Sequence, residues 1–202
     1  MKRSDKYPIF LLIFFLIVFL IAAIKPLYLR DWLLESLLTI ITVPVLILTY
    51  KKYRLSNTSY TSITILLILH TIGSHYTYSE IPFMAIDSYI GKLFDLSRNH
   101  YDRVVHFLFG ILIYFLILEI VQRIYKKEAN KFLTYLIPVL IITSLGAFYE
   151  VLEWIAAISV EPELGIAYLG TQGDQWYAQK DITLKLISSS FMMLFLYFRK
   201  KK

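Results

Sequence analysis

Six long apolar segments determine what this chain can fold into. Each is close to the roughly 20 residues that an α-helix needs to cross the hydrocarbon core of a bilayer. They span residues 7–24, 32–50, 60–75, 101–122, 132–158 and 182–198. Of the 202 residues, 57% are hydrophobic and only 18% are charged, whereas about a quarter of a soluble domain is charged. We predict an all-α, polytopic membrane bundle of about six transmembrane helices that forms a single integral membrane domain over residues 1–202.

The basic residues predict how the bundle is oriented. Fourteen of the 21 lysines and arginines lie at one set of helix ends, in the stretches 2–6, 51–54, 123–131 and 199–202. By the positive-inside rule this side faces the cytoplasm, so both termini are predicted to be cytoplasmic. The net charge of +6 does not predict a nucleic-acid partner, because the basic residues form short clusters between apolar runs rather than one basic face. The lipid bilayer is the expected partner.

Two longer connections, 76–100 and 159–180, fall on the opposite, outer side. The first contains the amphipathic stretch Phe83–Leu96, which we predict to be a re-entrant or interfacial helix. The second is rich in glycine, and we predict that Gly170–Asp181 covers the outer end of the bundle with Asp174 and Asp181 turned inward. The chain has no cysteine, which excludes disulfides, thiolate metal sites and cysteine nucleophiles.

Ionisable side chains inside the predicted spans gather at one depth. Such residues are costly in a membrane and mark a functional site or a buried pair. Asp102 and His106 are four residues apart and share a helix face, as do Glu150 and Glu153 at a spacing of three. The full group is His70, Asp102, His106, Glu150, Glu153, Asp174 and Asp181. At about 1.5 Å per residue, all of them fall within roughly 10 Å of the outer interface. Glu119 lies near the cytoplasmic end instead, where we expect it to reach toward the interface.

Two kinds of chemistry fit this group. His106, Glu150 and Asp102 are candidate catalytic residues that could act as general acid and base. The candidate ligands for a divalent metal such as zinc or manganese are His70, His106, Glu150, Glu153 and Asp181. A metal there could activate water against an ester or phosphoester, so an enzyme acting on a lipid or lipid-linked envelope substrate is the leading hypothesis. An ion or small-solute transporter and a structural or partner-binding membrane protein are the alternatives, so the sequence leaves enzymatic activity open.

Four ordered blocks resemble the YjdF family of bacterial inner-membrane proteins. They are HTIGSHYTY at 70–78, NHYDRVVHF at 99–107, YEVLEW at 149–154 and GTQGDQWYAQKDI at 170–182. The resemblance implies a multi-pass protein of the bacterial inner membrane, and it implies no particular reaction. Trp176 is followed by Tyr177 where the family pattern has an aspartate, so Tyr177 is given no role. The Asp-Arg-x-x-His and Glu-x-x-Glu patterns with a late aspartate are also similar, more weakly, to VanZ-like membrane proteins, which suggests envelope chemistry by analogy.

Overall fold

The part of the chain that the structure describes folds into helices. A computed structural model describes residues 4–82, 99–125 and 130–199, and this part contains helices and no strand. The helices are α1 (Lys6–Ala22), α2 (Leu29–Thr49), α3 (Asn57–His75), α5 (Tyr101–Tyr125), α6 (Lys131–Ile158), α7 (Pro162–Leu169) and α8 (Tyr177–Arg199). The predicted interfacial helix Phe83–Leu96 lies outside the described residues.

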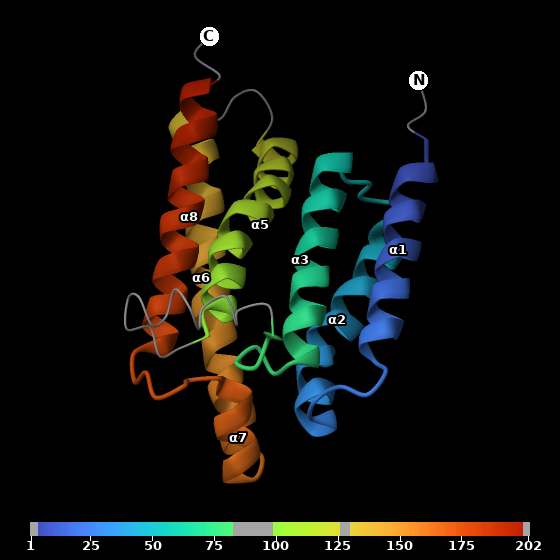
Figure 1. Cartoon of the computed structure of the whole chain (residues 1–202). Helices are drawn as coiled ribbons and strands as arrows, with labels where there is room; N and C mark the ends of the chain where they lie inside the picture. The colour runs from blue at the N-terminus through green and yellow to red at the C-terminus, as the bar shows by residue number, and fades with distance from the viewer. Residues whose placement is uncertain (1–3, 83–98, 126–129, 200–202) are drawn as a thin grey trace.

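The long helices have the lengths and apolar surfaces of membrane spans. α2, α5, α6 and α8 are each long and apolar enough to cross a membrane. α1 is a shorter apolar helix of 17 residues, and α3 has 19 residues with several serines and threonines among its apolar ones. Figure 1 shows these six helices packed side by side, with the N and C ends of the chain at the same end of the bundle. The predicted all-α polytopic bundle with about six transmembrane helices is confirmed.

Small residues allow α5, α6 and α8 to pack closely. A Cβ atom added at Gly110 of α5 would lie 1.9 Å from the hydroxyl of Ser188 and 2.7 Å from the carbonyl oxygen of Lys185, both on α8. A Cβ at Gly146 of α6 would lie 2.7 Å from the Lys185 side chain. Close approach at small residues is a common way for membrane helices to associate, because lipid supplies no hydrophobic drive between them. The buried core beside these contacts includes Tyr114, Ile142 and Met192.

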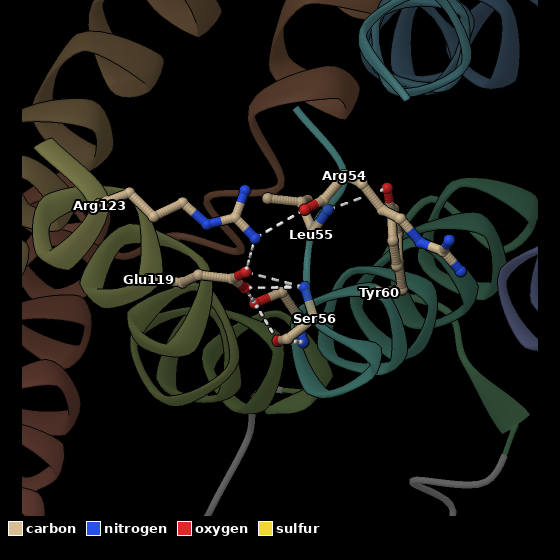
Figure 2. A network of polar contacts seen from close by, with 7 residues as sticks. Arg54, Leu55, Ser56, Tyr60, Glu119 and Arg123 are labelled. Atoms are coloured by element: carbon tan, nitrogen blue, oxygen red, sulfur yellow. Dashed lines mark hydrogen bonds and ion pairs between the residues drawn. The ribbon is translucent and has the colours of Figure 1, made fainter. Parts of the chain in front are cut away.

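A polar network fixes the junction between α3 and α5 at the end of the bundle that holds the termini (Figure 2). The Glu119 carboxylate on α5 accepts the backbone N–H of Ser56 at 2.8 and 3.0 Å and the hydroxyl hydrogen of Ser59. Arg123 donates to Glu119 and to the carbonyl of Arg54. A carboxylate at the start of a helix is favourable, because the first N–H groups have no partner in the helix. Glu119 therefore holds the start of α3 instead of only reaching toward the interface.

Candidate functional site

A cavity of about 430 Å³ lies inside the bundle. Its walls come from α2, α3, α5, α6, α7 and α8. The polar side chains that line it are Glu35, Thr42, His70, Tyr78, Asp102, His106, Tyr149, Glu153, Tyr168, Tyr177, Asp181 and Lys185. The volume is within the range of small-molecule sites. The first turns of α5 and α8 and the last turns of α3 and α6 meet here, which explains why residues far apart in the sequence share one depth.

Asp102, His106 and Asp181 form the tightest group of potential metal ligands in the described part of the chain. Asp102 and His106 lie one turn apart on α5, and the His106 Nε2 atom is 2.9 Å from Asp102 Oδ1. Asp181 on α8 places its Oδ2 atom 4.0 Å from the same nitrogen. One ligand atom from each residue lies within 4.8 Å of the other two. Metal–ligand bonds of about 2.0–2.2 Å place two ligands at most roughly 4.4 Å apart, so small side-chain rotations would complete a three-ligand site.

Burial makes this group unusual. The Asp181 side chain is 1% exposed, and its Oδ1 atom has no hydrogen-bond partner among the described residues. A buried carboxylate oxygen without a partner is costly, particularly in a membrane domain. A bound cation would satisfy this atom together with the Asp102–His106 pair. The residues present therefore fit a divalent metal.

His70 lines the same cavity, but both of its ring nitrogens already have partners. Its Nε2 lies 3.0 Å from the backbone carbonyl oxygen of Glu35, and its Nδ1 lies 2.5 Å from the hydroxyl of Tyr78. A carbonyl oxygen only accepts, so Nε2–H donates to it and Nδ1 accepts from the tyrosine in a neutral imidazole. The geometry thus places His70 in the cavity wall, bridging α2 to the segment after α3. It would have to release Tyr78 before Nδ1 could bind a metal.

Glu150 pairs with a lysine rather than joining the three-residue group. The Lys185 Nζ atom on α8 lies 3.0 Å from Glu150 Oε1 on α6, and the two side chains are 3% and 5% exposed. The ammonium also lies over the rings of Tyr149 and Phe109, at 5.7 and 6.0 Å from their centroids. Glu153, one turn further along α6, lines the cavity. The two glutamates of the Glu-x-x-Glu pattern therefore have different surroundings.

The segment after α7 attaches to the start of α5 through polar contacts. Asp174 accepts from Arg103 at 2.5 Å, from Lys180 at 2.8 Å and from the backbone N–H of Trp176 at 3.0 Å. The Lys180 ammonium first, then the Trp176 N–H and Arg103, lower the pKa of Asp174 to about 2. These contacts are complete above the ordinary value of 3.8 and are lost as the pH falls through about 2.

Of the two predicted inward-turned acids, only Asp181 lines the cavity. Asp174 instead anchors Arg103 outside it. Gly170 lines the cavity together with Asp181, so both ends of the Gly170–Asp181 segment reach the site. This part of the chain therefore borders the cavity, while its middle is held by the Arg103 and Lys180 contacts.

Sequence reasoning missed three buried charged residues near the site: Asp31, Glu35 and Lys185. Asp31 and Glu35 are four residues apart on α2, and Asp181 and Lys185 are four apart on α8. That spacing within an apolar helix is the available signal, because it places two charges on one face. Lys185 lies inside the apolar run 182–198, and Asp31 and Glu35 lie just before and just after the start of the apolar run 32–50, so hydrophobicity alone gives these residues no role.

The sequence of this chain matches known membrane proteins. A family described as "Predicted membrane protein (DUF2238)" matches residues 7–202. The chain belongs to this family. The chain is also 32% identical over 166 residues to "Inner membrane protein YjdF" of Escherichia coli (strain K12), covering 82% of this chain and 77% of that protein. No solved structure matches the chain. The predicted resemblance to YjdF is confirmed, and the weaker likeness to VanZ-like proteins stays a prediction.

Proposed function

We propose that this DUF2238 protein is a metal-dependent enzyme that acts on the polar end of a lipid or lipid-linked envelope substrate. The observation that carries the proposal is the Asp102–His106–Asp181 group in a cavity inside the bundle whose other walls are largely apolar. Two carboxylates and one imidazole are ligands that suit zinc or manganese. When bound, such a metal would polarise an ester or phosphoester and activate a water molecule.

The cavity wall favours an amphiphile over an ion pathway. On α5 the residues after His106 that line it are Phe109, Ile113 and Leu116. On α3 and α2 the lining continues toward the end of the bundle where α1 begins and α8 ends, with Leu67 and Leu46. Polar groups thus gather at one end, and hydrocarbon side chains line the rest. A substrate with a polar head and an apolar chain matches this division, whereas an ion would need polar partners along its path.

Other residues of the cavity would position the substrate. Tyr149, Tyr168 and Tyr177 line its wall and can donate hydrogen bonds to a polar head group. Glu153 lies in the same wall as an additional acid or base beside the metal group. The family pattern assigns no role to Tyr177, but its position in the cavity wall supports one as a hydrogen-bond donor or acceptor.

Lipid turnover tests this function directly. Purified protein in lipid nanodiscs is incubated with a bacterial envelope lipid extract and either Zn²⁺ or Mn²⁺, and the extract is compared with a His106→Gln reaction by mass spectrometry. We expect at least one lipid species to fall, and its hydrolysis product to rise, only with the unsubstituted protein. Identical lipid compositions in both reactions, with each metal, would contradict the proposal.

We also propose that the protein lies in the bacterial inner membrane with both termini in the cytoplasm. The basic residues at the terminal end of the bundle support this orientation. The two ends of the chain lie at one end of the bundle (Figure 1), and the relative is named as an inner-membrane protein. The cavity would then face the outer half of the membrane.

Reporter fusions after Lys202 test this orientation. Green fluorescent protein fused there should fluoresce, because it matures in the cytoplasm, and alkaline phosphatase fused there should be inactive, because it requires the periplasm. A phosphatase fusion after Trp176, on the opposite side, should be active and serves as the matched control. An active phosphatase at Lys202 would reverse the assignment.

A further inference from the structure

We propose that a hard divalent cation, of the calcium or magnesium type, binds on the buried face of α2 between Asp31 and Glu35. Glu35 lines the cavity that also holds the Asp102–His106–Asp181 group, but the proposed site uses other ligands and goes beyond the proposed enzymatic function. The evidence for this site is the polar surface that α2 buries against the rest of the bundle.

The buried face of α2 is polar. The side chains buried on this helix are those of Asp31, Glu35, Ser36 and Thr39, while Leu48 is 81% exposed. Asp31, Glu35 and Thr39 are spaced by four residues, so they follow one another along the same side of the helix. A span that turns polar residues inward and apolar residues outward needs polar partners within the protein.

Those partners are missing from the described part of the chain. Asp31, Glu35 and Thr39 are 1%, 5% and 4% exposed. The Asp31 Oδ1, Glu35 Oε2 and Thr39 Oγ1 atoms nevertheless have no hydrogen-bond partner there. The unpaired oxygens of Asp31 and Glu35 belong to side chains that are at least nine-tenths buried and one helical turn apart, so they point to an occupant that accepts electron pairs. The position of Asp31 in the first helical turn favours a negative charge, but it supplies no bond to the buried Oδ1 atom.

The charges around Glu35 also call for a cation. Asp31 lies one helical turn before Glu35 on the same buried face of α2. Asp102 on α5 and Glu153 on α6 line the same cavity as Glu35. Among the described residues, neither Asp31 nor Glu35 forms an ion pair with lysine or arginine. Carboxylates that face one another in a low-dielectric interior repel strongly unless positive charge lies between them.

The ligand atoms define the class of cation. The carboxylates of Asp31 and Glu35 offer oxygen only, which suits calcium or magnesium. The two negative charges of Asp31 and Glu35 match a divalent ion, and water would complete its coordination. The group around His106 contains nitrogen and suits zinc or manganese instead. The two sites would therefore prefer different metals.

Terbium luminescence tests this site on the full chain in detergent or nanodiscs. Tb³⁺ binds oxygen ligands as calcium does, and a tryptophan excited at the red edge of its absorption sensitises the ion when it is near. Trp32 follows Asp31 directly, whereas the side chains of Trp154 and Trp176 are more than half exposed. We expect saturable emission that Ca²⁺ displaces. Trp32→Phe should remove most of the emission, and Trp154→Phe should not.

The nearly isosteric variants Asp31→Asn and Glu35→Gln should each weaken terbium binding by about tenfold or more, by loss of a charged ligand. Asp181→Asn should keep the affinity, which distinguishes this site from the proposed enzymatic centre. Circular dichroism and gel filtration show whether each variant is folded, and Glu35→Gln provides the test if Asp31→Asn is not. Emission that survives in both α2 variants but disappears in Asp181→Asn would overturn the proposal. So would the absence of any Ca²⁺-displaceable emission from the unsubstituted protein.

Discussion

Asp181→Asn is expected to purify as a folded membrane protein that has lost most of its bound metal. The amide has nearly the volume of the carboxyl, so packing at this buried position is preserved. It removes the negative charge 4.0 Å from His106 Nε2 and leaves two of the three candidate ligands. Loss of even a supporting residue around a metal typically lowers affinity about 10- to 100-fold, so loss of a direct ligand should lower it at least as much. Inductively coupled plasma mass spectrometry of protein purified from zinc- or manganese-supplemented cells gives the metal content per chain.

The control for this experiment is a carboxylate outside the site. Glu161→Gln removes the same charge from a side chain that is 73% exposed and pairs only with Arg30 at 3.2 Å. It should retain the metal content and the membrane yield of the unsubstituted protein. Equal metal content in Asp181→Asn and Glu161→Gln would remove Asp181 from the site, even if both proteins insert normally.

The fold was predictable because a helix that crosses a membrane requires a long apolar run, and such runs can be identified directly in the amino-acid sequence. The ends of the helices were less predictable where charged side chains turn inward. α8 begins at Tyr177, whereas the apolar run begins at residue 182, because Lys180 and Asp181 belong to the first turns of the helix. Hydrophobicity alone places the boundary at such charges, although a helix continues through them when they face a polar cavity.

Part of the site was predictable from spacing and depth. Asp102 and His106 follow from their separation of four residues, and the depth argument places Asp181 near them. Which partner each acid selects depends on how the helices are rotated about their axes, and sequence spacing does not determine this. Glu150 could have faced the histidines, but α8 presents Lys185 to it at 3.0 Å. In the same way, Arg103 on α5 binds Asp174, which lies in the connection between α7 and α8.

The acids of α2 show a different limit of sequence reading. Asp31 and Glu35 lie in a helix whose apolar residues outnumber its charged ones, so the segment reads as a lipid-facing span. In the structure the apolar residues face outward and the few polar ones are buried. For a membrane helix, polar positions therefore identify the interior face, which is the reverse of the rule for a soluble protein.

Lys185→Met is expected to destabilise the protein by about 3–5 kcal/mol, the usual consequence of removing one partner of a buried ion pair. Methionine keeps most of the side-chain stem that packs against Gly146, so the main change is the lost ammonium. Glu150 would be left with its carboxylate almost fully buried, and its Oε2 atom already has no partner among the described residues. Unfolding by sodium dodecyl sulfate, followed by circular dichroism, measures the change in the free energy of unfolding.

Two further variants separate the ion pair from a general effect of losing a lysine. Lys180→Met removes a half-exposed ammonium that pairs with Asp174 at 2.8 Å, and exposed pairs contribute at most about 1 kcal/mol. The double variant Lys185→Met with Glu150→Leu replaces the whole pair by apolar groups, which is often neutral and should restore most of the lost stability. If Lys185→Met is no less stable than Lys180→Met, the Glu150 charge is not held by Lys185. If the double variant is as unstable as Lys185→Met, the loss comes from packing against Gly146, Phe109 and Tyr149 rather than from an unpaired carboxylate.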